Sequence, residues 1–131
     1  MSDKAYAYVN GNNAEIYLPP GITAAVKVRT NSHLTQKVAL TRNDGTVDHV
    51  FSGTGEHNTQ IGTATVEGGE SVLAATFEYS SDDGAFKPSR LNSGGPYEIG
   101  TYNLLVIVAE NGDDADYNDA ILEFSWYTPR A

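Results

Sequence analysis

The chain has 131 residues, with 17 acidic and 8 basic side chains and a formal net charge of −9. This length suffices for a buried core, and we expect one domain over residues 1–131. The acidic excess argues against nucleic acid and anionic membrane surfaces as partners. The chain has no cysteine, which excludes disulfides and thiolate chemistry.

The N-terminal residues lack the basic start and apolar centre of a secretory signal peptide. No apolar run is long enough to span a membrane, so no membrane insertion is expected. We therefore expect the protein to be made in the cytoplasm, and export by a route without a cleaved signal stays open.

Period-2 alternation of apolar and polar residues recurs between turn signals, and no helical periodicity interrupts it. One predicted strand carries Val47, His49 and Phe51 on a single face. The other predicted strands are, in chain order, Ala5–Val9, Glu15–Leu18, Val26–Thr30, Lys37–Thr41, Gln60–Val66, Ser71–Ser80, Thr101–Ala109 and Ala120–Trp126.

Turn residues separate these strands. Asn10-Gly11 and Asn43-Asp44-Gly45 favour hairpins, because Asn-Gly and Asp-Gly tolerate positive φ. The stretch Gly55–Asn58 is predicted to be a turn, and Lys87–Pro96, with two prolines and Gly94-Gly95, is predicted to be a loop. The pattern predicts an all-β fold: an antiparallel β-sandwich, or a related jelly roll, of about nine strands.

The most informative segment is Glu110–Asp119, which reads Glu-Asn-Gly-Asp-Asp-Ala-Asp-Tyr-Asn-Asp. It holds five carboxylates, two side-chain amides and no basic residue. Two like charges about 4 Å apart at a protein surface repel by about 4 kcal/mol, so a counter-ion is expected. Calcium takes about 6–8 oxygen ligands, and this density of hard oxygens suits it.

Other interpretations of the acidic segment and of the chain fit less well. A solvated turn explains isolated Asp-Gly pairs but not ten residues of this composition. The spacing Asp114-x-Asp116-x-Asn118 resembles the start of an EF-hand, but Asp119 replaces the required glycine. Zinc is disfavoured because cysteine is absent. No nucleophile-elbow serine motif occurs, and paired acids of a glycosidase are a minor alternative.

The segment Glu110–Asp119, followed by Ala-Ile-Leu-Glu-Phe-Ser-Trp126, closely resembles the signature of the bacterial two-calcium, fucose- and mannose-binding lectins (LecB-type). Weaker matches follow in the same order along the chain, at Leu18-Pro19, Asn31-Ser32-His33, Phe51-Ser52-Gly53 and Ile61-Gly62-Thr63. The resemblance runs from about Ala14 to Trp126. Residues 1–13 form an N-terminal extension that lies outside the pattern.

The resemblance implies a β-sandwich in which two adjacent calcium ions bind sugar hydroxyls directly. The implied metal ligands are Asn31, Glu110, Asp114, Asp116, Asn118 and Asp119, with Asp116 and Asp119 bridging the ions. The implied carbohydrate-binding residues are Ser32, His33, Leu34, Asn111, Gly112, Asp114, Asp116 and Asp119. Within these, Ser32–Leu34 falls on the stretch that discriminates between monosaccharides in the family.

The chain departs from the family pattern at three places. Asn111 stands where the family usually has an aspartate, and His33 and Leu34 replace small residues. The chain also ends at Ala131, two residues beyond the family's usual terminal glycine, whose carboxylate reaches a calcium site in the partner subunit.

We expect a non-enzymatic, calcium-dependent lectin for fucose- or mannose-type monosaccharides or glycan termini, acting as a homodimer or higher oligomer. The alternative is a calcium-stabilised structural or adhesin domain without an open sugar site.

Overall fold

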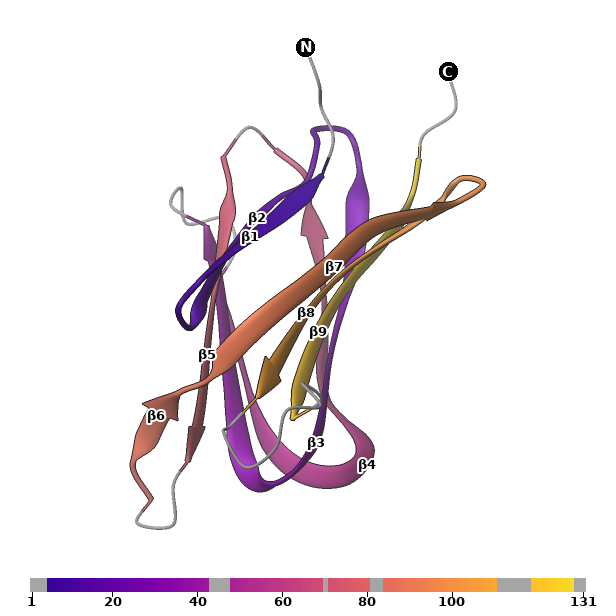
Figure 1. The fold of residues 1–131 in the computed structure, drawn as a ribbon. Coiled ribbons are helices and arrows are strands. Elements are labelled where there is room, and N and C mark those ends of the chain that lie inside the picture. The colour runs from indigo at the N-terminus through magenta and orange to yellow at the C-terminus, as the bar shows by residue number, and fades with distance from the viewer. Residues whose placement is uncertain (1–4, 43–47, 70, 81–83, 111–118, 129–131) are drawn as a thin grey trace.

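The computed structural model describes residues 5–42, 48–69, 71–80, 84–110 and 119–128. These residues form nine antiparallel strands arranged as one strongly curved sheet, which confirms the predicted all-β class (Figure 1). The strands are β1 (Tyr6–Asn10), β2 (Asn13–Tyr17), β3 (Thr23–Arg42), β4 (Asp48–Glu67), β5 (Leu73–Ser80), β6 (Phe86–Pro88), β7 (Arg90–Ile99), β8 (Tyr102–Glu110) and β9 (Ala120–Tyr127). No helix in this described part has the length and apolar character needed to cross a membrane.

The strand order is β1-β2-β5-β3-β9-β8-β7, with β4 also paired to β3 and β6 to β5. The 20-residue strand β3 belongs to both halves of this sheet. Its first part pairs with β9 at residues 25–30, and its second part pairs with β5 at residues 36–42. Figure 1 shows β3 and β4 curving together between these two parts, at the lower end of the molecule.

The core follows from alternation along the strands. In β3 the residues from Ala24 to Thr30 alternate between buried and more exposed, as a strand covered on one face requires. The largest fully buried apolar side chains come from β2, β3, β5, β8 and β9 and the segment after β2: Ile16, Leu18, Leu40, Leu73, Phe77, Leu105, Ile107, Leu122 and Phe124. Burial of a side chain of this size contributes about 1.5–3 kcal/mol to folding.

A continuous apolar run such as Leu104–Ala109 is typical of strands that are covered on both faces. In the structure β8 alternates instead, and Val106 and Val108 are half-buried on the outer face. The reason is that β8 lies in an antiparallel sheet between β7 and β9, whose outer face has no covering layer among the described residues.

Lys87–Pro96 is not the predicted loop, because it contributes to β6 and β7. Proline lacks an N–H donor and is tolerated on edge strands and at bulges. Pro88 lies in the short strand β6, which pairs with β5. Pro96 lies where the pairing of β7 with β8 shifts register between Gly94 and Tyr97, and Gly95 there has φ of +96°.

The two predicted strands Val26–Thr30 and Lys37–Thr41 are parts of the single strand β3. Likewise, the predicted turn at Gly55–Asn58 lies inside β4, where His57 and Asn58 adopt positive φ. The backbone does change direction at these places, but the pairing of β3 with β4 continues past them with register shifts.

The predicted N-terminal strand is present as β1, which brings the N-terminal extension into the sheet as a hairpin with β2. Gly11, at φ of +63°, lies in the predicted Asn10-Gly11 turn. Tyr6 stacks on Tyr17 at 5.7 Å between ring centroids, and its hydroxyl donates to Glu15 Oε2 at 2.9 Å. That hydrogen bond raises the pKa of Tyr6. The predicted Asn43–Gly45 turn lies outside the described residues.

Beyond the end of β4, the chain passes very close to the segment that precedes β3. Gly68 N donates to Ile22 O at 2.9 Å, and Gly69 N donates to Leu18 O at 3.1 Å. A Cβ atom at Gly68 would lie 1.7 Å from the carbonyl oxygen of Pro19. A side chain of any size is therefore incompatible with this approach of two backbones.

Candidate functional site

Three predicted calcium ligands come together at one end of three neighbouring strands. In the strand order β3-β9-β8, Thr30 pairs with Ala120, and Ala120 pairs with Ala109. The next residues outward are Asn31, Asp119 and Glu110. Backbone hydrogen bonds join these strand ends: Asn31 N donates to Asp119 O at 3.1 Å, and Asp119 N donates to Ala109 O at 3.0 Å.

The two carboxylates of this set are buried. Glu110 is 1% exposed and Asp119 is 4% exposed. Burying ionised carboxylates is costly unless they are paired, hydrogen-bonded or bound to a metal. Each of these residues has an interaction partner in the structure, and as oxygen donors at adjacent strand ends they are chemically suited to a hard cation.

The other predicted metal ligands, Asp114, Asp116 and Asn118, lie outside the described residues, as do Asn111 and Gly112, which were predicted to bind the sugar. So does Ala131, whose carboxylate was considered as a ligand in a partner subunit. Within the described ranges, no group of three or more His, Cys, Asp or Glu residues is close enough to hold a metal ion. The structure therefore shows where three of the predicted ligands lie, and the metal site itself is a prediction from the sequence.

Asn31 is also tied to β4. Its Oδ1 accepts a hydrogen bond from Asn58 N at 2.5 Å. An amide oxygen has two lone pairs and can accept two contacts. Asn58 and His57 have φ of +61° and +67°, a conformation that is uncommon for residues other than glycine. The unusual backbone of β4 thus fixes the side chain of Asn31.

The predicted sugar-discriminating residues lie at the bend of β3, next to Asn31. Ser32 is buried, Leu34 is half-buried and His33 is exposed. Ser32 Oγ accepts a hydrogen bond from Leu34 N at 3.1 Å, which makes a tight local turn. Ser32 therefore serves to shape the bend, and of the three side chains His33 is the most available to solvent.

Sequence reasoning missed the polar residues that support this bend from neighbouring positions. Gln36 Nε2 donates to Leu34 O at 3.2 Å, Thr54 Oγ1 donates to Ser32 O at 3.1 Å, and Ser80 Oγ accepts from Thr35 N at 3.1 Å. Thr54 and Ser80 come from β4 and β5. Their roles depend on strand pairing between distant segments, and no local pattern in the sequence signals them.

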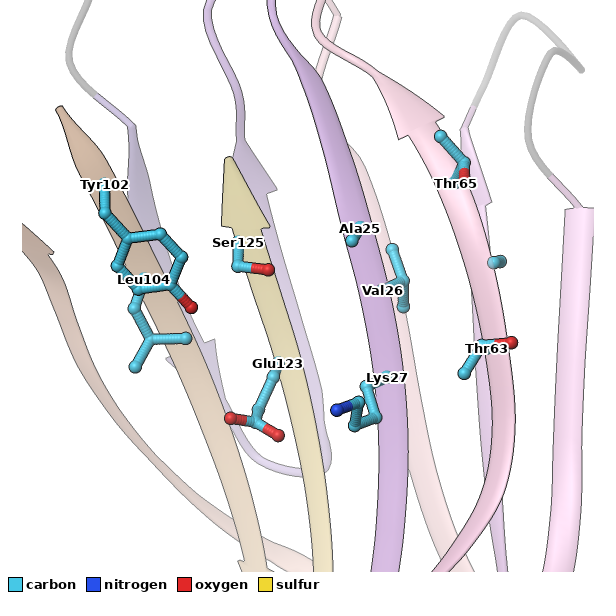
Figure 2. Close-up of a pocket in the computed structure, with 10 residues that line it drawn as sticks. Ala25, Val26, Lys27, Thr63, Thr65, Tyr102, Leu104, Glu123 and Ser125 are labelled. Atoms are coloured by element: carbon cyan, nitrogen blue, oxygen red, sulfur yellow. The ribbon is translucent and has the colours of Figure 1, made fainter. Parts of the chain in front are cut away.

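A groove of about 390 Å³ lies on the outer face of the sheet, away from these residues. Figure 2 shows its labelled lining along four adjacent strands, from β8 through β9 and β3 to β4: Tyr102, Leu104, Ser125, Glu123, Ala25, Val26, Lys27, Thr63 and Thr65. It lies towards the Tyr102–Tyr127 end of the β8–β9 pair, whereas Ala109 and Ala120 mark the opposite end. None of its residues belongs to the predicted metal or sugar site.

The ring of His49 stacks on that of Phe51 at 6.0 Å between centroids. His49 pairs with Leu40 in the second half of the β3–β4 hairpin, which agrees with packing.

Comparisons with known proteins agree with this fold. The family model of Fucose-binding lectin II (PA-IIL) matches residues 16–128. No curated protein sequence matches the chain.

Among solved structures, three bacterial lectins are similar. The Chromobacterium violaceum lectin CV2L, in complex with alpha-methyl-fucoside, is 27% identical with a TM-score of 0.70, covering 94% of this chain and 100% of that one. The C-terminal domain of the BC2L-C lectin from Burkholderia cenocepacia is 25% identical with a TM-score of 0.68, covering 96% and 100%. The Ralstonia solanacearum high-affinity mannose-binding lectin is 24% identical with a TM-score of 0.69, covering 89% and 96%. At this identity the similarity supports only the fold of the chain.

The family match covers most of the chain, including the strand ends that carry Asn31, Glu110 and Asp119 and the acidic segment between β8 and β9. The chain therefore belongs to the fucose-binding lectin II family and is a carbohydrate-binding lectin rather than an enzyme.

Proposed function

We propose that this lectin binds fucose- or mannose-type sugars through calcium ions, two per chain, held by Asn31 and the segment Glu110–Asp119. The observation that carries the proposal is the convergence of Asn31, Glu110 and Asp119 at adjacent strand ends. The similar Chromobacterium lectin bound to alpha-methyl-fucoside supports the sugar class.

The residues of the chain have separate roles in this proposal. Glu110 and Asp119 are fixed at the ends of β8 and β9, so they hold both ends of the acidic segment on rigid elements. Bound calcium would supply coordination positions that a pair of neighbouring sugar hydroxyls can fill. Carboxylates beside the ions accept hydrogen bonds from those hydroxyls, and such charge-assisted bonds are stronger than neutral ones. His33 and Leu34 at the bend border the sugar and refine the choice between rings.

Removal of calcium is expected to abolish sugar binding. Calorimetric titration with methyl fucoside and methyl mannoside should give heat in calcium buffer and none after treatment with a chelator. Readdition of calcium should restore the heat, and its binding should raise the melting temperature, because a ligand of the native state stabilises it.

Two other results would reject the proposal. Sugar heat that persists in chelator would show that no metal is needed. A melting temperature raised by calcium, with no response to either sugar, would instead identify a calcium-stabilised structural domain.

We also propose that the lectin is a homodimer or higher oligomer, because individually weak sites gain avidity when they are linked. The outer groove suits packing of a second copy. Its centre carries small side chains, and Lys27 and Glu123 supply both signs of charge, as a self-complementary two-fold interface requires. Glu123 is also paired with Arg29.

Ala25→Arg is expected to convert the oligomer to a monomer. Ala25 is an exposed residue in the groove, and a long charged side chain there would keep two sheet faces from approaching to the usual separation of about 10 Å. Sedimentation velocity measures the change. Ala74→Arg is the matched control, because Ala74 is exposed on β5, in the other half of the sheet. A wild-type monomer, or an Ala25→Arg oligomer of wild-type mass, would contradict the interface.

A further inference from the structure

The bend of β3 has little ladder pairing of its own. Thr30 pairs with Thr59, Ser32 pairs with Gly55, and the next paired residue is Gln36, opposite Gly53. His33, Leu34 and Thr35 have no paired residue in the described strand registers. The conformation of these three residues therefore depends on hydrogen bonds from side chains rather than on the sheet.

Gln36 supports the bend from inside the protein. Its side chain is 1% exposed, and its Nε2 donates to the carbonyl oxygen of Leu34 at 3.2 Å. The other amide atom, Oε1, is buried without a hydrogen-bond partner among the described residues. A buried polar atom in this state costs about 1–3 kcal/mol. At this position an apolar side chain of similar volume would therefore serve stability at least as well as glutamine.

Thr54 supports the bend from the opposite side. Its Oγ1 donates to the carbonyl oxygen of Ser32 at 3.1 Å. Thr54 itself is exposed on β4, so its hydroxyl adds little to the core. The carbonyl groups of the two residues that flank His33, Ser32 and Leu34, are thus each held by a side chain from outside the bend.

We propose that Gln36 and Thr54 are positioning residues that set the backbone of the bend and thereby the preference of the lectin between sugars. They act through Ser32, His33 and Leu34 and do not themselves contact the sugar. The inference rests on the proposed function, because it assumes that the bend borders the sugar site.

The experiment compares Thr54→Val, which removes the hydroxyl at nearly constant volume, with Thr54→Ser, which retains it. Thr41→Val is the control, because Thr41 is exposed on β3 beyond the bend. Calorimetry in saturating calcium gives the ratio of the dissociation constants for methyl fucoside and methyl mannoside. Thr54→Val should change this ratio by about 2- to 10-fold, the range of one net hydrogen bond, whereas Thr54→Ser and Thr41→Val should keep the wild-type ratio.

Gln36→Leu adds a readout that a merely structural role would not give. The melting temperature should stay at or above that of the wild type, and the calcium affinity should be unchanged. The ratio of the two sugar dissociation constants should nevertheless shift as it does in Thr54→Val. A wild-type ratio in Thr54→Val would overturn the proposal even if Gln36→Leu does not fold. Wild-type protein that binds neither sugar would reject the proposed function itself, and this inference with it.

Discussion

Asp119→Asn is expected to weaken sugar binding by at least about 100-fold and to raise the melting temperature of the calcium-free protein. Loss of residues that only orient metal ligands typically costs about 10–100-fold in metal affinity, and loss of a bridging ligand should cost at least as much. The backbone of Asp119 is held by Ala109 O and Asn31 N, and the substitution leaves these two hydrogen bonds intact.

The expected rise in the melting temperature of the calcium-free protein has an electrostatic cause. Asp119 is one of five carboxylates within ten residues, and like charges about 4 Å apart at a protein surface repel by about 4 kcal/mol at most. Removing one charge relieves part of this repulsion. For a protein of this size, each kcal/mol shifts the melting temperature by about 4 °C, so a rise of a few degrees is expected.

Calorimetry and thermal melts with and without calcium measure both effects. Asp48→Asn is the control, because Asp48 is an exposed residue of β4 that pairs with Thr41, away from the acidic segment. Asp48→Asn changes the net charge by the same amount as Asp119→Asn, and it should leave the sugar affinity and the calcium affinity at wild-type values. Retention of full calcium affinity in Asp119→Asn would remove Asp119 from the ligand set.

Gly68→Ala is expected to lower the free energy of unfolding by about 3 kcal/mol, at the upper end of the usual cost of overpacking. The added Cβ would lie 1.7 Å from Pro19 O, and a backbone carbonyl cannot rotate aside as a flexible side chain can. Relief requires the two segments to separate, which breaks the hydrogen bonds from Gly68 N to Ile22 O and from Gly69 N to Leu18 O.

Gly69→Ala is the matched control in the neighbouring position. Its Cβ would meet the Arg42 guanidinium at 3.5 Å, which is ordinary van der Waals contact with a side chain that can move. Urea denaturation of the two variants should show a large loss of stability for Gly68→Ala and a small change for Gly69→Ala. Equal stabilities would show that the two backbones do not approach this closely.

The sequence predicts strands well where alternation is regular and fails where the backbone irregularities are part of the sheet. The alternation of Val26 and Val28 with polar residues leads directly to the first half of β3. The stretch Lys87–Pro96 was predicted as a loop because proline and glycine usually end strands, yet an edge strand and a bulge accommodate both. The residues of such a stretch cannot by themselves show whether it is a loop or part of an edge strand, because that depends on the strand that pairs with it.

The candidate site was likewise predictable from the sequence only in part. The acidic composition of Glu110–Asp119 identifies the segment and its chemistry, and the family resemblance adds Asn31. The meeting of Asn31 with Asp119 depends on the order β3-β9-β8, which pairs residues far apart in the sequence. Gln36 and Thr54 were missed for this reason: nothing in their own surroundings in the sequence marks them, and their contacts exist only once β3 bends.

The passage of β3 through both halves of the sheet has a consequence for how the lectin opens. A hinge between the halves would have to pass through the bend itself, because one continuous strand of 20 residues joins them. Sub-global opening in proteins usually separates contiguous units with few contacts between them. Here the residues proposed to border the sugar occupy the junction of the two halves, so we expect the bend to open together with the core instead of fraying as an independent surface segment.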